Sequence, residues 1–453
     1  MKHFGWKWLA ASSLLIAALA ANAEIRPQYG GVLRVAMRAA PASLDPAERN
    51  VADSFGRRNL TSLIFDTLVT MDDAERVRPV LAESWQALGN QQWRFRIRRN
   101  VKFHDGTPLT AESVAASLRF ANPSWKVTAD ADWVMIQGEF SEEQLLAELT
   151  LPRNAVVKRD SGQLTGTGPF HIVEWQAGSA LTLTADENCW RGRPFLDGIE
   201  VEMGKSYRDQ MTALQLGRAD LIEVSPEQTH RISQEGRRIA SSMPIELVAV
   251  WFARDAASAD EKLLRSALEL SVERSSIRDV LLQGAGEPAG SVLPGWMSGY
   301  GFVFSTAADL AKARQLRAQV AAIPNWKLGY EADDPLAGLL TERLALNGRD
   351  AGLSLRTTPS SGADLRIARV PLEHDGWAAL SDIAEQVGAP LTKKYGSLEE
   401  LYAAERGLLA SGKLIPLLHL PVSYASAPHL RSWKVRPDGM LNLEDAWLEN
   451  TTP

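Results

Sequence analysis

The hydrophobic pattern along this chain alternates between short strand-like runs and amphipathic helix-like runs. In the strand-like runs apolar residues are continuous or alternate with polar ones, whereas the helix-like runs repeat their apolar residues at helical spacing. The predicted strands span 31–36, 134–136, 172–175, 181–184, 219–222, 246–252, 326–330, 364–370 and 415–420. The predicted helices span 59–68, 145–151, 207–216, 260–282 in two stretches, 308–320 and 335–347. This alternation predicts α/β layering with a largely parallel sheet.

A β-hairpin over 85–101 is the clearest local signal. After a glycine–asparagine turn, Trp93, Phe95 and Ile97 alternate with arginines. Such an arginine ladder is more typical of the solvated face of an antiparallel strand than of an anion site. A helix follows, with Thr110 as its predicted N-cap and a serine three residues later.

The N-terminus has the pattern of a signal peptide over 1–23. Lys2 and Lys7 precede an apolar run over 8–21, which is shorter than the roughly 20 residues needed to cross a bilayer. An Ala-Asn-Ala sequence ends at Ala23 and predicts cleavage there. The alternative is an uncleaved membrane anchor. No other segment of the sequence is apolar enough to span a bilayer, so a soluble mature chain is expected.

The only cysteine, Cys189, lies far from the predicted cleavage site. A lipid-anchored cysteine at the mature N-terminus is therefore excluded, as are a disulfide and a cysteine metal cluster. An exported protein without disulfides depends on a large core, and a chain that is 45% hydrophobic has material for two or three packed units. These features predict a periplasmic protein of a Gram-negative cell that is not a lipoprotein.

Charge and motifs exclude several functions. A formal net charge of −6 argues against nucleic-acid binding but leaves the charge of any cleft open. The seven histidines are single, and the sequence holds no Gly-x-Ser-x-Gly, His-Glu-x-x-His or cysteine–histidine signature. We therefore predict no catalytic residues, no metal ligands and no cofactor, with a secreted hydrolase as the rival class.

The stretch from Trp93 to Leu118 resembles the signature of a known family. Its core is Val-Lys-Phe-His-Asp-Gly at 101–106, followed by Leu-Thr-Ala-Glu at 109–112. It is similar to the peptide/nickel/oligopeptide-binding solute receptors of ABC importers, also called extracellular solute-binding protein family 5. Further segments fit the family in order: 43–46, 81–85, 166–170, 188–199, 213–220, 264–268, 271–274 and 284–294. Within the core, we expect His104 and Asp105 to fix a turn rather than to perform acid–base chemistry.

The resemblance implies an α/β, two-lobed periplasmic-binding-protein (Venus flytrap) fold with mixed sheets and a hinge between the lobes. The expected divisions are a signal peptide at 1–23, lobe 1 at 24–246 with a trimmed subdomain at about 47–160, lobe 2 at 247–423, and a C-terminal return to lobe 1 at 424–453. The expected crossing segments are 244–253 and 415–424.

The implied function is that of a periplasmic solute-binding component of an ABC importer. It would capture a peptide or similar small polar solute by hinge closure and deliver it to permease subunits in the inner membrane, acting as a monomer. The alternatives are a nickel-chelate complex, another small solute, or presentation of the ligand to a sensor protein. The chain departs from the family at 120–132, which is short, and at 368–377, where Glu373 or Asp375 could replace the carboxylate that holds a peptide amine.

The predicted ligand-binding residues lie near the expected crossing segments or at the first turn. Aromatic residues there offer stiff apolar walls, and an arginine and a histidine offer polar anchors for a carboxylate or similar group. For the aromatic residues and the histidine, ordinary core packing is the alternative. The candidates are Ser43, Trp251, Arg254, Trp377, His419 and Tyr424.

Overall fold

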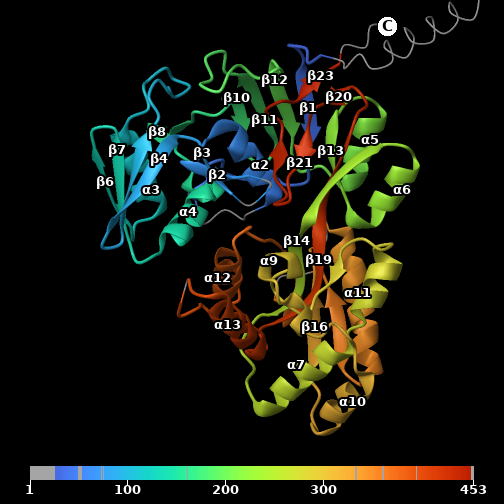
Figure 1. The fold of residues 1–453 in the computed structure, drawn as a ribbon. Coiled ribbons are helices and arrows are strands. Elements are labelled where there is room, and N and C mark those ends of the chain that lie inside the picture. Colours follow the sequence, from blue (N-terminus) through green and yellow to red (C-terminus); the bar gives the residue numbers. More distant parts are fainter. Residues whose placement is uncertain are drawn as a thin grey trace, which may run out of the picture.

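The computed structural model describes residues 26–48, 54–72, 74, 76–160, 162–331, 334–359, 362–393 and 395–449. The predicted signal peptide lies outside the described residues. Within the described part, no helix combines the length and apolar character needed to cross a membrane. Two lobes are joined by a pair of long strands (Figure 1). We call the described residues before Pro244 and after Pro421 lobe 1, and those between them lobe 2.

Two long strands connect the lobes. β14 (Arg238–Phe252) and β19 (Leu414–Ser426) pair antiparallel from one lobe into the other. The register shifts on both sides of Pro244, which lies opposite Pro421. Since proline has no N–H to donate, this pair interrupts the ladder at the waist between the lobes. The lobe boundaries predicted at 246/247 and 423/424 both fall inside these strands.

Lobe 1 continues the sheet on one side of the crossing pair. Its strands follow the order β10-β11-β12-β1-β13, and β13 pairs with β19. The strands are β10 (Phe170–Gln176), β11 (Ala180–Ala185), β12 (Gly198–Glu202), β1 (Val32–Ala36) and β13 (Leu221–Val224). The associated helices are α2 (Phe55–Ile64), α5 (Tyr207–Gln215) and α6 (Thr229–Gln234).

A subdomain with its own small sheet projects from lobe 1. Its strand order is β4-β5-β7-β6, with β4 (Ala82–Gly89), β5 (Gln92–Ile97), β7 (Trp133–Gln137) and β6 (Lys126–Asp130). Helices α3 (Ala111–Ala121) and α4 (Glu142–Thr150) belong to the same unit. The predicted hairpin is confirmed, because Trp93 and Phe95 are buried while Arg94 lies over the outward-facing Trp133 ring. The predicted cap is also confirmed, since Thr110 accepts from the Ser113 N–H in a capping box.

The predicted turn at His104 and Asp105 joins this subdomain to the main sheet. The His104 Nε2 atom lies 2.9 Å from the Gly168 carbonyl oxygen, and Asp105 accepts from the backbone and hydroxyl of Thr107. Gly106 adopts φ +81°, which glycine reaches at little cost. The structural role expected for this motif is confirmed.

Lobe 2 continues the sheet on the other side through β18 (Leu365–Pro371), β16 (Asn325–Gly329) and β17 (Ser354–Thr358). Alternate residues of β14 pack into two hydrophobic cores on opposite faces of the lobe 2 sheet. Val248 and Val250 belong to one core, and Leu247 and Ala249 to the other. The first face is covered by α7 (Ala259–Ser271), α10 (Leu310–Ala318) and α11 (Pro335–Asp350). The second is covered by α9 (Gly295–Ser298), α12 (Gly376–Gln386) and α13 (Leu398–Ala410) (Figure 1).

The sheet is mixed, which confirms the fold class but not the largely parallel sheet predicted from the strand–helix alternation. Among the described strands, parallel pairing is confined to β1 with β12 and β13, and to β16 with β17 and β18. The β10–β11 hairpin and the crossing strands are antiparallel, because the chain enters lobe 2 along β14 and returns along β19. The alternation of strands and helices in the sequence does not show that the chain returns to lobe 1 beside β14, so it could not predict this antiparallel pair.

Gly166, in the glycine-rich segment before β10, packs closely against the end of α2. A Cβ atom there would lie 1.9 Å from the Ile64 carbonyl oxygen. We predict that Gly166→Ala lowers the free energy of unfolding by about 1–3 kcal/mol or more, because backbone rather than a flexible side chain has to move. Gly407→Ala, at an exposed position of α13 with open space around it, serves as the control and is expected to be about 1 kcal/mol stabilising. Urea unfolding measures both, and equal stability of the two variants would contradict the packing argument.

Candidate functional site

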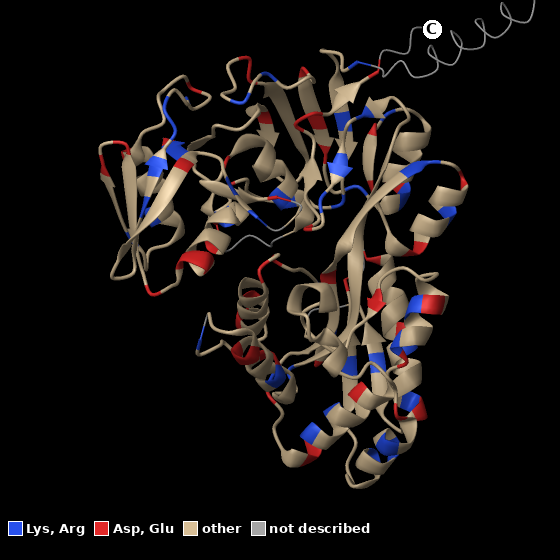
Figure 2. Ribbon diagram, viewed as in Figure 1, with Lys and Arg blue, Asp and Glu red and all other residues tan. Residues whose placement is uncertain are grey.

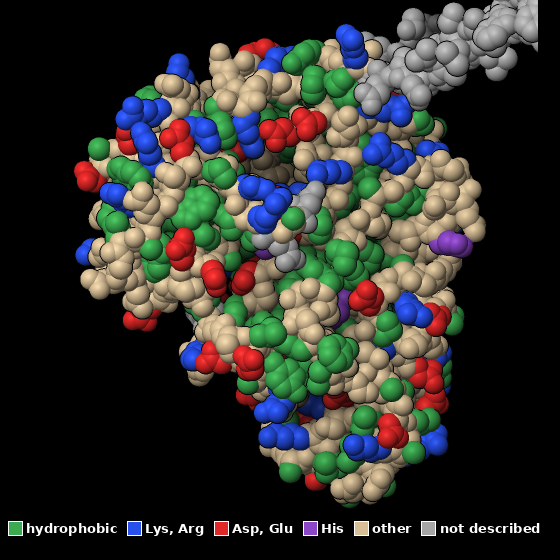
Figure 3. All heavy atoms as spheres, viewed as in Figure 1, with side chains coloured by type: hydrophobic (Ala, Val, Ile, Leu, Met, Phe, Trp, Pro, Cys, Tyr) green, Lys and Arg blue, Asp and Glu red, His purple; other side chains and the backbone are tan. Residues whose placement is uncertain are grey.

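A cavity of about 3180 Å³ lies between the two lobes. Its described lining comes from α2, the subdomain and the β13 region of lobe 1, and from β18, α12 and the start of α11 in lobe 2. Among the described lining residues are ten carboxylates and seven arginine or lysine side chains. Charges of both signs occur on both lobes (Figure 2), and the space-filling view shows charged side chains of both signs on the surface near the junction of the lobes (Figure 3). A cleft of this composition suits a polar or zwitterionic solute better than an apolar one.

A charged group lies at the waist end of the cavity. Arg369 of β18 pairs with Glu246 of β14 at 2.7 Å and with Asp334, the N-cap of α11, at 3.1 Å. Lobe 1 presents Tyr207 and Glu223 to the same cavity. Burial raises the pKa of Tyr207 to about 12, and burial also raises the pKa of Glu223 above its usual range. The Tyr207 hydroxyl therefore stays protonated near neutral pH.

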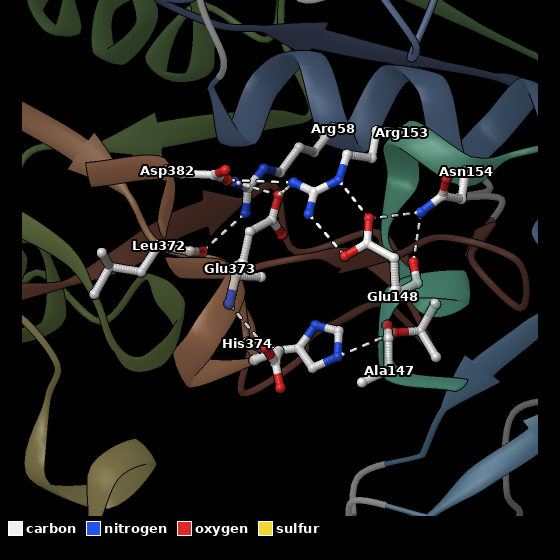
Figure 4. Close-up of polar contacts among 12 residues, drawn as sticks. Arg58, Ala147, Glu148, Arg153, Asn154, Leu372, Glu373, His374 and Asp382 are labelled. Atoms are coloured by element: carbon white, nitrogen blue, oxygen red, sulfur yellow. Dashed lines mark hydrogen bonds and ion pairs between the residues drawn. The ribbon is translucent and has the colours of Figure 1, made fainter. Parts of the chain in front are cut away.

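A second charged group joins the lobes directly (Figure 4). Arg58 of α2 in lobe 1 lies 3.2 Å from the Glu373 carboxylate of lobe 2, and it donates a 2.9 Å hydrogen bond to the Leu372 carbonyl. Both charged side chains are over nine-tenths buried. A buried ion pair of this kind is held by geometry and extra hydrogen bonds, so its position depends on how the lobes sit.

Arg153 extends this bridge from the subdomain (Figure 4). It is held by Glu148 at 2.9 Å, and its guanidinium lies 3.2 Å from Asp382 and 3.6 Å from Glu373 in lobe 2. Nearby, the Thr150 hydroxyl lies 3.1 Å from His374 Nε2. The lobes are therefore linked by side chains as well as by the crossing strands.

The family model "Bacterial extracellular solute-binding proteins, family 5 Middle" matches residues 76–352. The chain belongs to this family. The resemblance predicted from the signature at 93–118 is confirmed, and so is the family fold.

Several known proteins are similar to this chain over different spans of sequence. "Uncharacterized protein YhjP" of Bacillus subtilis is 34% identical over 174 residues, covering 35% of this chain and 30% of the relative. The oligopeptide-binding protein AppA of B. subtilis is 24% identical over 297 residues, covering 58% of this chain and 54% of the relative. In sequence, this chain thus matches only about a third to a half of these relatives' length.

The fold extends over nearly the whole chain. The structure of B. subtilis AppA in complex with a nonapeptide superposes with a TM-score of 0.76 at 18% identity, covering 94% of this chain and 100% of the other. The structure of NikA from Brucella suis in complex with Fe(III)-EDTA gives 0.78 at 18% identity, covering 92% and 100%. At these identities the match concerns the fold.

Of the predicted site residues of this family 5 chain, the cavity reaches Trp251, which is 6% exposed and lines its wall. The five others do not line it. Ser43 accepts from the Asp45 N–H within its own turn. Arg254 is exposed and pairs with Glu261 at 2.9 Å, so its guanidinium is engaged at the far end of β14.

The remaining three candidates are buried in the lobes. The Trp377 indole donates to the Gly396 carbonyl beneath α12, and His419 lies 2.9 Å from the Val292 carbonyl. The Tyr424 hydroxyl accepts from an asparagine of α2. These contacts match the core-packing alternative stated above. A role for any of them in solute binding stays a prediction.

The two carboxylates considered for a peptide amine are both occupied. Asp375 caps α12 by accepting from the Ala378 N–H, and Glu373 forms the bridge to Arg58. Sequence reasoning missed Arg58, Arg366 and the other cleft arginines. For Arg366 a signal was available, since it alternates with Leu365 and Ile367 in a strand of the segment that departs from the family.

The buried histidine gives a pH test of this assignment. Burial lowers the pKa of His419 to about 4, below the value of about 6.5 expected in the unfolded chain. Between these values the unfolded chain binds a proton that the native state does not. Stability is therefore full above about pH 6.5 and falls as the pH drops, by about 3 kcal/mol at pH 4 from this group.

We predict that His419→Gln removes this part of the acid sensitivity, while the matched variant of exposed His230 keeps it. Urea unfolding at pH 7 and pH 4.5 gives the difference between each variant and the parent. An unchanged pH slope in His419→Gln would show that folding does not lower the pKa of His419.

Proposed function

We propose that this chain is the periplasmic solute-binding component of an ABC importer, which captures a small polar solute between its lobes and passes it to permease subunits in the membrane. The observation that carries the proposal is the large cavity lined by charges of both signs from both lobes. Membership in family 5 supports it. Export rests on the signal peptide predicted at 1–23, which lies outside the described residues.

We propose a peptide or another zwitterionic solute as the ligand class. One family 5 structure of this fold holds a nonapeptide and another holds Fe(III)-EDTA, so the architecture serves both peptides and metal chelates in related proteins. Among the described residues, no group of three His, Cys, Asp or Glu side chains is placed to hold a metal ion. A nickel chelate is the second candidate, because the chelator's own carboxylates would meet the cleft arginines.

Binding would proceed by hinge closure around the paired strands. The register shifts on both sides of Pro244 and Pro421 make the waist the weakest part of the ladder. A solute that contacts both lobes binds the closed form better than the open form, and this difference shifts the population toward closure. We propose that the protein acts as a monomer and releases the solute chemically unchanged.

A ligand screen tests the proposal. We predict that one class among di- to pentapeptides, amino sugars and nickel chelates raises the melting temperature of the mature protein. At 100 times its dissociation constant, a ligand adds about 2.7 kcal/mol to the free energy of unfolding. Trp251→Phe is expected to weaken binding severalfold, while Trp133→Phe, on the outer sheet of the subdomain, leaves it unchanged. Cleavage of a chromogenic substrate without any thermal shift would favour the hydrolase alternative.

The side-chain bridge gives a separate prediction about closure. Glu373→Gln keeps the shape but removes the charge that meets Arg58, so we expect the closed-to-open ratio of the unliganded protein to fall about fivefold. Spin labels at exposed Ala116→Cys on α3 and Ala403→Cys on α13, in a Cys189→Ala background, report the distance between the lobes.

Glu399→Gln, exposed on α13, is the matched control. If the two variants show identical distance distributions, the bridge does not govern closure.

A further inference from the structure

Arg366 differs from four other described cations of the cleft, which are held by protein groups. Arg369 and Arg153 pair with carboxylates, Arg57 donates to backbone carbonyls, and Lys393 pairs with Glu400. Among the residues that the structure describes, Arg366 makes no hydrogen bond or ion pair, although it lines the cavity and is exposed to it. The cleft therefore holds a positive charge whose donors are not used by the protein.

The Arg366 guanidinium packs against the ring of Trp251. The Arg366 guanidinium carbon lies 5.4 Å from the centroid of the Trp251 ring. The two residues are directly opposite each other on β18 and β14, and Arg366 is opposite Gly329 of β16 on its other side. All three line the cavity. A guanidinium against an aromatic face keeps its N–H groups free at the edge, so a cation–π contact orients it without consuming its donors.

A second donor at the same place has no acceptor. Trp251 is 6% exposed, and its indole Nε1 is buried without a hydrogen-bond partner among the described residues. Leaving a buried N–H unsatisfied costs about 1–3 kcal/mol, so such groups need an explanation. Trp251 lines the cavity, so a solute acceptor that reaches this N–H through the wall would satisfy it.

We propose that Arg366 and Trp251 form a subsite for a carboxylate group of the solute. A planar carboxylate has two oxygens that match the paired donors of a guanidinium, and its remaining acceptor capacity serves the indole N–H. Glu331 follows two residues after Gly329, the residue opposite Arg366, and Glu331 lines the cavity, so its carboxylate disfavours additional negative charge there. A monoanion is therefore preferred to a dianion such as phosphate. The subsite deepens the proposed function and rests on it, because it names the anionic end of the captured solute.

Acetate tests the subsite without knowledge of the natural solute. In protein labelled with ¹⁵N at the indole, the Trp251 signal is assigned by its loss in Trp251→Phe. At constant ionic strength we expect acetate to shift this signal saturably, and acetamide, which has the same shape without the charge, to leave it unchanged. Arg366→Gln is expected to raise the acetate midpoint about tenfold.

Arg356→Gln is the matched control, because Arg356 is also an exposed arginine of this sheet, on β17, and does not line the cavity. It should titrate like the parent. Absence of a saturable shift, equal midpoints in the two arginine variants, or tighter binding of inorganic phosphate than of acetate overturns the proposal. Saturable acetate binding in a protein that no solute stabilises would instead leave the subsite standing and refute the importer function.

A peptide that binds in the ligand screen extends the test. Amidation of its C-terminus is expected to weaken binding about tenfold in the parent and to have little effect in Arg366→Gln, because the amide no longer offers the charged acceptor. Equal losses in both proteins would place the peptide carboxylate elsewhere.

Discussion

The antiparallel pairing of β14 with β19 is the constraint on which the rest of the structure depends. These strands carry the chain into lobe 2 and back, and they join both lobe sheets into one eleven-stranded sheet. Their alternate residues supply cores on both faces in lobe 2, so the lobe cannot shift freely against them. At Pro244 and Pro421 the ladder is interrupted at the waist, and the cavity lies beside that interruption, with Pro421 in its wall.

The positions of the charged groups explain how a bound solute could change the balance between open and closed lobes. The Arg58–Glu373 bridge joins the lobes through groups that are costly to desolvate, so its net contribution to closure is a small difference between large terms. Such a contact is easily shifted by a solute with a few kcal/mol of differential affinity. Arg366 and Trp251 lie on the lobe 2 wall of the same cavity and offer donors that the protein leaves unused. In the proposed function, the Arg58–Glu373 bridge would hold the lobes together, while Arg366 and Trp251 would hold the solute.

Local features were predictable from sequence and distant ones were not. The hairpin at 85–101 and the cap at Thr110 depend on residues within a few positions, and both appear as expected. β14 begins at Arg238 rather than at the predicted 246, because its polar first half becomes a strand only by pairing with β19 from the other end of the chain. Trp251 could be found from its place on a crossing segment. The partners Arg58 and Glu373 are 315 positions apart, so no sequence motif joins them.

Hydrogen–deuterium exchange of the mature protein, with and without a solute that raises its melting temperature, tests the central claim most directly. If the solute is held between the lobes, backbone protection should increase on both walls of the cavity: α2 of lobe 1, and the strand-to-helix segment 363–387 of lobe 2. Protection confined to one lobe, or located only away from the cavity, would contradict capture by closure.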